Sequence, residues 1–283
     1  MSLQKRFEAL SGTLVEGAPD PNALSIFEEF LTALEAGTIR AAERDDNGVW
    51  RAVLWVKQGI LFGFRIGRLT DMSVPTDSDG TRFSFVDKHT IPPRAFSEHD
   101  GVRIVPGGST IRRGTYIAKG VVCMPPMFVN VGAWVGAGTM IDSHALVGSC
   151  AQIGERVHLS AAAQIGGVLE PVSASPVVIE DDALVGGNCG VYEGTVVRSK
   201  AVLAAGVVLT RGTPVYDLVN ERVLHGSANQ PLEIPEGAVV VPGARAVSSG
   251  WGKKHGLSLQ TPVIVKYRDE KTDTATALEA WLR

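Results

Sequence analysis

Aliphatic side chains recur at every sixth position through the middle of the chain. The series runs from Ile111 to Ile165, breaks, and resumes with the same spacing from Ile179 to Val215. Cys123 is its only member that is not Ile, Val or Leu. Helices and simple sheets have side-chain periods of about 3.6 and 2 residues, so neither explains this pattern. A period of six predicts a parallel β-helix, in which each hexapeptide forms one short strand and one corner.

A second set of positions supports this interpretation. The residue four places after each aliphatic is mostly small or β-branched, with Met127 as the bulky exception. Small residues suit tight corners, and three hexapeptides would close one triangular coil. Residues eighteen apart then stack, so we expect Ile117, Val135 and Ile153 to form one interior ladder. With strands about 4.8 Å apart, roughly six coils would make a column on the order of 25 to 30 Å tall.

The break in the series predicts a loop. Ile165 and Ile179 are separated by two hexapeptides plus two further residues, so part of this segment must leave the coil. We expect a protruding loop over 168–178, which is rich in Pro and Ser. Loops on regular scaffolds often carry function, although a harmless insertion is the alternative.

The residues before the column predict a separate N-terminal helical α/β domain over 1–104. Asn22 is placed to cap a first helix, and Gly37 is placed to end it. A turn is expected at 45–48, and the apolar stretch 50–66 is long enough for a second buried helix. The stretch 69–80 has the composition of a turn.

The residues after the column predict a short extension. We place the β-helix domain at 105–217 and a C-terminal region of strands and helix at 218–283. Short strands are expected near 238–241 and 262–266, with a final helix over 274–282. Such ends would cap a β-helix, whose exposed terminal edges otherwise invite aggregation.

Composition narrows the class of protein. The 283 residues are 45% hydrophobic, and the formal net charge is only -3. We find no Lys/Arg-rich run for a nucleic-acid partner, no apolar signal segment and no stretch long enough to span a membrane. A cytoplasmic protein is therefore expected. Its three cysteines lack the CxxC spacing of zinc or redox motifs, which favours buried, reduced thiols and no bound metal.

Several motifs along the column and its flanks match one family of enzymes. They are GVRIVP at 101–106, MIDSHALVGSCAQIGERVHLS at 140–160, QIGGVLEP at 164–171, VIEDDALVGG at 178–187, YEGTVV at 192–197 and VIVK at 263–266. Together they resemble the tetrahydrodipicolinate N-succinyltransferases. The resemblance spans nearly all of the coil region and both flanks, and it is weakest before residue 35.

This resemblance implies a fold, an assembly and a reaction. The fold is mainly β, a left-handed parallel β-helix with the N-terminal domain and C-terminal extension described above. The assembly is a homotrimer with active sites between neighbouring subunits. The reaction moves succinyl from succinyl-CoA, a co-substrate rather than a tightly bound cofactor, to the amino group of ring-opened tetrahydrodipicolinate. The product would be N-succinyl-2-amino-6-oxopimelate, an intermediate of lysine and diaminopimelate biosynthesis.

Two residues match the family's acceptor site. From the period alone, Asp142 is a turn residue that bonds its own backbone, and Arg103 is a surface ion pair. The resemblance instead implies that Asp142 contacts the acceptor and deprotonates its amine. It also implies that Arg103 binds an acceptor carboxylate, because a planar guanidinium can donate two parallel hydrogen bonds.

This chain departs from the family pattern at two places. Gly190 stands where other members carry a Glu suspected of catalysis, and Glu193 is the nearest substitute. Asn188 stands where some members have Arg, so the second acceptor carboxylate would be bound differently. We take Glu193 as the second candidate catalytic residue.

The sequence also offers candidates for the coenzyme groove and interpretations of two histidines. The resemblance implies that the pantetheine arm of the coenzyme lies in a groove between subunits. Small residues would let this arm approach the backbone, and the candidates are Gly166, Gly167, Ala205 and Gly206. The coil itself also demands small residues at corners. His144 and His158 are fourteen residues apart and do not share a hexapeptide position. A γ-carbonic-anhydrase-like zinc site needs three histidines, so ordinary surface or hydrogen-bonded histidines are the preferred interpretation.

Three other functions stay open at this point. Another hexapeptide acyltransferase, dependent on acetyl-CoA and acting on an amine or a hydroxyl, would usually need a histidine base for a hydroxyl acceptor. A scaffold without catalysis would release no thiol from acyl-CoA. A sugar-nucleotide pyrophosphorylase would need a Gly-rich nucleotide loop, which we do not find in the first hundred residues.

Overall fold

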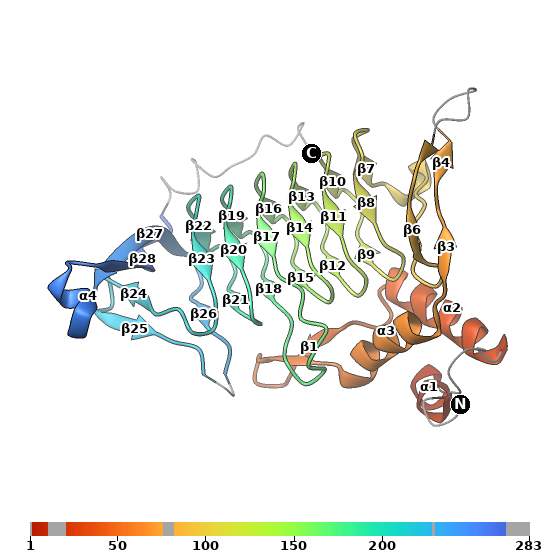
Figure 1. The fold of residues 1–283 in the computed structure, drawn as a ribbon, viewed down its shortest axis with the longest axis horizontal. Helices are drawn as coiled ribbons and strands as arrows, with labels where there is room; N and C mark the ends of the chain where they lie inside the picture. Colours follow the sequence, from red (N-terminus) through yellow and green to blue (C-terminus); the bar gives the residue numbers. More distant parts are fainter. Residues whose placement is uncertain (1, 11–20, 76–81, 228–229, 270–283) are drawn as a thin grey trace.

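A three-sided column of parallel strands forms the centre of the molecule (Figure 1). The computed structural model describes residues 2–10, 21–75, 82–227 and 230–269. The first face contains β7 (Arg103–Ile104), β10 (Val122–Cys123), β13 (Met140–Ile141), β16 (His158–Leu159), β19 (Leu184–Val185) and β22 (Val202–Leu203).

Two further faces complete the column. The second face contains β8 (Thr110–Ile111), β11 (Phe128–Val129), β14 (Leu146–Val147), β17 (Gln164–Ile165), β20 (Gly190–Val191) and β23 (Val208–Leu209). The third face contains β9 (Tyr116–Ile117), β12 (Trp134–Val135), β15 (Gln152–Ile153), β18 (Val178–Ile179), β21 (Val196–Val197) and β26 (Glu233–Ile234). The parallel β-helix predicted from the period of six is confirmed.

The strand register reproduces the expected ladders. Val135 pairs with Ile117 on one side and with Ile153 on the other, eighteen residues away in each direction. The side chains of this series lie inside the column, and Val135 and Ile153 are completely buried. Burying one such side chain is worth roughly 1.5 to 3 kcal/mol, so the stacked rungs supply the main stabilisation of the column.

The corners explain the small residues of the sequence. An added Cβ at Gly148 would lie 2.1 Å from the backbone nitrogen of Gly167 on the next coil. Several corner residues have a left-handed backbone, among them His144, Asn188 and Glu193 with φ between 55° and 62°. The coil thus selects small or turn-forming residues before any ligand is considered.

The N-terminal region packs against the third face. It contains α1 (Leu3–Leu10), α2 (Pro21–Glu35), β1 (Ala42–Arg44), β2 (Trp50–Ala52) and α3 (Leu54–Ile66). The helix predicted from 22 begins at Pro21, a residue suited to the first turn because it needs no N–H partner there. Gly37 follows the helix with φ +72°, as expected of a terminating glycine.

The prediction of one helix over 50–66 is wrong in its first part. Residues 50–52 form β2, which pairs with β1 across the turn predicted at 45–48. Asp45 fixes that turn by accepting hydrogen bonds from the backbone N–H groups of Asn47 and Val49. Trp50 is then buried against Val178 and Val196 of the third face, so tertiary packing decides in favour of the hairpin.

Short strands replace part of the predicted turn over 69–80. β3 (Leu69–Asp71) pairs with β6 (Val86–Lys88), and β4 (Val74–Pro75) pairs with β5 (Arg82–Phe83). A short 3-10 helix, η1 (Glu98–Asp100), then leads into β7. Residues 76–81 lie outside the described part of the chain.

The C-terminal region extends the first face. Its elements are β24 (Val215–Asp217), β25 (Arg222–Leu224), β27 (Ala238–Ala246), α4 (Gly250–Lys254) and β28 (Ser258–Tyr267), and the strand order beyond β22 is β27-β28-β24-β25. The two predicted strands are present and longer than expected. The helix predicted over 274–282 lies outside the described residues. No helix among the described residues is long and apolar enough to cross a bilayer.

The inserted loop does not extend freely. After β17 the chain leaves the coil and lies against α3, where the buried Lys57 ammonium donates to the carbonyl oxygens of Pro171 and Ala174 at 3.0 and 2.7 Å. The Ser175 hydroxyl also donates to the Trp50 carbonyl at 3.4 Å. The loop therefore connects the column to the N-terminal region.

Candidate functional site

The corners of the column form three edges, which we name by the faces they join. The first edge joins the first and second faces and includes Asp142 after β13. The second edge joins the second and third faces and includes Glu193 after β20. The third edge joins the third face back to the first and includes Glu155 and Asp181.

Asp142 lies at the first edge, with its side chain 32% exposed. Its Oδ1 accepts a hydrogen bond from the backbone N–H of Ser143 at 2.7 Å, so the turn interpretation of this residue is correct. The second oxygen, Oδ2, points to the neighbouring strand. Asp142 is thus fixed by its own turn while one carboxylate oxygen remains available for chemistry.

His158 is the neighbour of that second oxygen. It lies on β16 in register with Met140, and its Nε2 is 3.8 Å from Asp142 Oδ2. The histidine side chain is only 18% exposed. Sequence reasoning did not pair these residues, yet the signal was present. One coil is eighteen residues long, so His158 stacks on Met140. Asp142 is two residues after Met140, which places the corner residue Asp142 beside the strand residue His158.

His144 lies on the same edge but takes part through its backbone. Its N–H donates to the Pro126 carbonyl, and its own carbonyl accepts from the Gln164 side chain at 3.1 Å. Within residues 2–10, 21–75, 82–227 and 230–269, no three His, Cys, Asp or Glu side chains gather as a metal site would require.

Arg103 lies on the same face as Asp142, near the start of the column. It pairs with Val122 of β10, and Val122 in turn pairs with Met140 of β13. Two strand spacings separate Arg103 from the strand that carries Asp142, which is about 10 Å. The exposed guanidinium and the Asp142 carboxylate therefore belong to one side of the molecule.

Glu193 is not brought to Asp142 within the chain. It lies on the second edge, two coils further along the column. Its Oε2 accepts from the backbone N–H of Arg211 at 3.0 Å. It borders a cavity of about 640 Å³ whose other wall includes Pro171 and Ser173 of the inserted loop. Gly190 lies in β20 on the second face.

The four small residues assigned to the coenzyme fall on two edges. Ala205 and Gly206 lie on the first edge with Asp142, whereas Gly166 and Gly167 lie on the second. A Cβ added at Gly166 would lie 2.7 Å from the Tyr192 ring, and one at Gly167 would lie 2.6 Å from the Ser149 nitrogen. Packing between coils therefore accounts for both second-edge glycines without a ligand.

The three cysteines are free and buried. Burial raises the pKa of Cys123 and of Cys150 to about 12, and it also raises the pKa of Cys189. Since the thiolate is the reactive form, none of the three is set up as a nucleophile at neutral pH.

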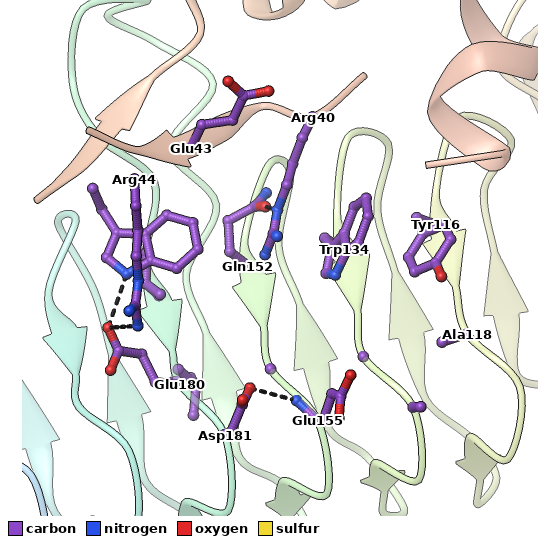
Figure 2. Close-up of a pocket in the computed structure, with 16 residues that line it drawn as sticks. Arg40, Glu43, Arg44, Tyr116, Ala118, Trp134, Gln152, Glu155, Glu180 and Asp181 are labelled. Atoms are coloured by element: carbon purple, nitrogen blue, oxygen red, sulfur yellow. Dashed lines mark hydrogen bonds and ion pairs between the residues drawn. The ribbon is translucent and has the colours of Figure 1, made fainter. Parts of the chain in front are cut away.

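A second site, absent from the sequence predictions, lies between the β1–β2 hairpin and the third face. Figure 2 shows this cavity, which measures about 490 Å³. Tyr116, Trp134 and Gln152 form an outward ladder along its floor at intervals of eighteen, and the first two rings stack at a centroid distance of 3.8 Å. The eighteen-residue spacing of these outward residues was the available sequence signal.

Arg40 projects from the N-terminal region into this cavity (Figure 2). Its guanidinium lies 4.1 Å from the Trp134 ring centroid and 5.0 Å from that of Trp50, and its Nε donates to the Gln152 side chain. Burial lowers the Arg40 pKa to about 10, against the opposing effect of the nearby Glu43 and Asp181 carboxylates. The guanidinium is therefore rigidly held and poorly solvated.

Glu180 closes one end of the cavity. This buried carboxylate accepts from Trp50 Nε1 at 2.9 Å and from Arg198 at 2.9 Å, and Arg44 lies 2.7 Å away. Burial alone would raise its pKa, but these partners outweigh burial and lower it. The charge of Arg44 is thus matched by Glu180, whereas no carboxylate in the described part of the chain forms an ion pair with Arg40.

Family models and individual relatives agree on one assignment. A model described as "Tetrahydrodipicolinate N-succinyltransferase N-terminal" matches residues 5–66, and one described as "Hexapeptide repeat of succinyl-transferase" matches residues 176–211. A 2,3,4,5-tetrahydropyridine-2,6-dicarboxylate N-succinyltransferase from Polynucleobacter asymbioticus is 40% identical, over 99% of this chain and 97% of its own. The enzyme of that name from Bradyrhizobium diazoefficiens is 43% identical, over 90% of this chain and 88% of its own.

A solved structure shows the same fold at much lower identity. It is titled as a putative 2,3,4,5-tetrahydropyridine-2-carboxylate N-succinyltransferase from Campylobacter jejuni, with a TM-score of 0.51 and 16% identity. The match covers 92% of this chain and 65% of that one. On the strength of the near-complete matches at 40% identity and above, this chain belongs to the tetrahydrodipicolinate N-succinyltransferase family.

Proposed function

We propose that this protein transfers the succinyl group of succinyl-CoA to the amino group of ring-opened tetrahydrodipicolinate. The products are N-succinyl-2-amino-6-oxopimelate and free coenzyme A, a step of lysine and diaminopimelate biosynthesis in the cytoplasm. Family membership supports the reaction. The observation that carries the chemistry is the Asp142 carboxylate on the first edge, fixed by Ser143 and 3.8 Å from His158.

Aminolysis of a thioester needs a base beside the attacking nitrogen. Nitrogen forms a bond to the thioester carbonyl carbon, the carbon–sulfur bond breaks, and the nitrogen loses a proton while the thiolate gains one. Asp142 Oδ2 accepts the proton from nitrogen in this proposal. His158 Nε2 lies 3.8 Å from the same oxygen, within ion-pair range but beyond the range of a hydrogen bond.

The acceptor is recognised through its carboxylates. Arg103 binds one of them through two parallel hydrogen bonds, about 10 Å along the first face from the strand of Asp142. This span suits a seven-carbon chain with its amine near Asp142 and a terminal carboxylate within reach of a long arginine side chain. With Asn188 in place of a second arginine, the other carboxylate is held by neutral donors.

The complete site is proposed to form between subunits of a homotrimer. The N-terminal region covers the third face, whereas the second face carries the partly buried Phe128 and Leu146 and borders both edges that hold candidate residues. Packing two copies along this face would bring Glu193 on the second edge of one copy toward Asp142 on the first edge of the other. Succinyl-CoA is then a co-substrate in the same groove, near Gly166, Gly167, Ala205 and Gly206.

A thiol-release assay tests the reaction. Purified protein is mixed with succinyl-CoA and a thiol reagent, with and without tetrahydrodipicolinate, and the series is repeated with acetyl-CoA. We expect release only when both succinyl-CoA and the acceptor are present. Equal rates with acetyl-CoA would replace the succinyl assignment by an acetyltransferase, and no release under any condition would support a scaffold.

A further inference from the structure

We propose that the cavity between the β1–β2 hairpin and the third face is a binding site for a zwitterionic α-amino acid with an unbranched side chain. Arg40 would bind the carboxylate, and the acidic residues of the third edge would bind the ammonium group. Within one chain this cavity is separate from the proposed transferase residues, because Asp142 and Arg103 are not among the residues that line it.

Arg40 provides the anion-binding half of the site. Its Nε is used by Gln152, while among the described residues no acceptor is hydrogen-bonded to Nη1 or Nη2. These terminal groups carry four N–H donors, which face the cavity beside Trp134 (Figure 2). The guanidinium lies against the Trp134 ring and the Trp50 ring, and these two contacts hold it in the cavity. A pre-positioned, poorly solvated guanidinium of this kind pairs favourably with a carboxylate.

Acidic side chains provide the cation-binding half. Asp181 and Glu155 lie on the opposite border of the cavity from the Arg40 backbone, and Glu43 lies above it (Figure 2). Asp181 Oδ1 accepts from the Glu155 backbone N–H at 2.9 Å, which fixes the carboxylate and leaves Oδ2 for a ligand. Asp181 is close enough to raise the Arg40 pKa, so a positive and a negative group occupy one small space.

The balance of charge and the packing of the rings exclude other ligand classes. Four carboxylates and two guanidinium groups line the cavity. Glu155 is paired with Arg156, and Glu180 with Arg44 and Arg198, so Asp181 and Glu43 supply the negative charge that disfavours a phosphate or a polyanion. Trp134 is covered by Tyr116 on one side and by Arg40 on the other, so a nucleobase has no free face on which to stack. The floor includes Ala118, Gly136 and Gly154, which present no long side chain to the cavity, so an alkyl chain can lie along it. Packing between coils also requires both glycines, because an added Cβ would lie 2.5 Å from the Gly154 backbone or 2.3 Å from Asp181 Oδ1. A cavity of about 490 Å³ lies within the usual range for small-molecule sites.

Isothermal titration of the purified full-length protein tests the proposal with three related probes. Norleucine carries both charged ends, hexanoate lacks its ammonium group, and pentylamine lacks its carboxylate. We expect norleucine to bind at least about tenfold more tightly than either, because each charged hydrogen-bonded end contributes more than about 1.4 kcal/mol. Equal affinities for the three probes, no binding of any, or tighter binding of inorganic phosphate would overturn the proposal.

Matched variants locate the binding. Asp181→Asn keeps the oxygen that accepts from Glu155 but removes the charge, so norleucine should bind it no better than hexanoate does. Glu236→Gln is the control, because this exposed residue occupies the same corner position two coils further along the third edge. Norleucine affinity should be unchanged in this control and in Asp142→Asn. A loss in Asp142→Asn would assign the binding to the transferase site instead.

Arg40→Gln provides the complementary test. It should abolish the binding of norleucine and hexanoate while leaving that of pentylamine unchanged. If the circular dichroism of this variant shows that it does not fold, the Asp181→Asn titration decides alone. Retention of norleucine affinity in Asp181→Asn would contradict the proposal.

Discussion

Asp142 shows how much of a residue's role depends on its immediate neighbours. Its backbone turn is a property of the hexapeptide corner, and a turn Asp can be predicted from the period alone. The nearby His158 imidazole, by contrast, follows from the stacking of coils and was not predicted. Glu193 was chosen as the nearest substitute for the carboxylate missing at Gly190, and its Oε2 accepts a hydrogen bond from the Arg211 backbone N–H, a partner that was not predicted. The six-residue period predicts which residues lie at corners. It does not predict their side-chain partners, because these come from the neighbouring coils.

Asp142→Asn is expected to lower kcat by at least about a hundredfold, the usual contribution of a positioned general base. The amide can still accept from Ser143, so the fold and the melting temperature should be unchanged. The thiol-release rate and the circular dichroism spectrum measure these effects. Asp46→Asn, an exposed residue in the β1–β2 turn, is the control and should retain its rate. A near-normal rate for Asp142→Asn would remove this residue from the mechanism.

Asp217 makes stability depend on pH at the acid end. Burial alone would raise its pKa, but hydrogen bonds from Asn220, Tyr267 and Arg222 outweigh burial and lower the pKa to about 2. A lowered pKa means that its contribution to stability is present above about pH 4 and is lost as the pH falls toward 2. Asp217→Asn should therefore cost about 1 to 3 kcal/mol at pH 7 and progressively less on acidification.

Urea unfolding of the wild type and of Asp217→Asn at several pH values measures this difference. Glu236→Gln, at an exposed corner, should show no difference from the wild type at pH 7. A gap between Asp217→Asn and the wild type that stays constant down to pH 2 would contradict the proposed role of the ionised carboxylate.

At the scale of elements, regular repetition made the column predictable and tertiary packing made the flanks harder to predict. The column strands from β8 to β23 follow from one aliphatic position in six, and the ladder through Val135 has the predicted register. The series misses β7 and β26, and its last member, Val215, lies in β24 of the C-terminal extension. The stretch 50–66 was assigned a single helix because it is apolar throughout, but burial of Trp50 against the third face turns its first residues into a strand. The loop after β17 was predicted from the broken spacing, while its attachment to Lys57 involves residues more than a hundred positions apart.

Lys57→Met tests that attachment. The variant loses both donated hydrogen bonds, leaves the Pro171 and Ala174 carbonyls unsatisfied, and should be destabilised by about 1 to 3 kcal/mol. Hydrogen exchange, followed by mass spectrometry, should rise in peptides that cover 168–177. Lys119→Met, at an exposed corner, is the control and should change neither quantity. Unchanged exchange in Lys57→Met would show that the loop is held by other contacts.

At the scale of the whole molecule, the candidate residues are distributed over two edges of one column. Asp142 and His158 lie together at the first edge, and Ala205 and Gly206 lie three coils further along it, whereas Glu193 lies on the second edge. No single chain brings these groups together, which is why we place the complete site between copies. The six-residue repeat predicts the fold of one chain. It does not predict which faces of the column contact each other in an assembly.

Light scattering after size-exclusion chromatography tests the assembly. A trimer of this 30.0 kDa chain has a mass of about 90 kDa, three times that of one subunit. Leu146→Arg places a charge at a partly buried position of the second face and should shift the mass toward one subunit, with loss of activity. Leu69→Arg, on an exposed strand of the N-terminal region, should leave the mass unchanged. A wild-type protein of one-subunit mass that is fully active would contradict an intersubunit site.

Identification of the product tests the central claim most directly. The protein is incubated with tetrahydrodipicolinate and succinyl-CoA labelled with carbon-13 in the succinyl group, and the products are analysed by mass spectrometry and NMR. We predict a single new compound in which the intact labelled succinyl group is joined to nitrogen through an amide, formed by the wild type and nearly absent with Asp142→Asn. Label found only in free succinate, or in an ester, would contradict the account.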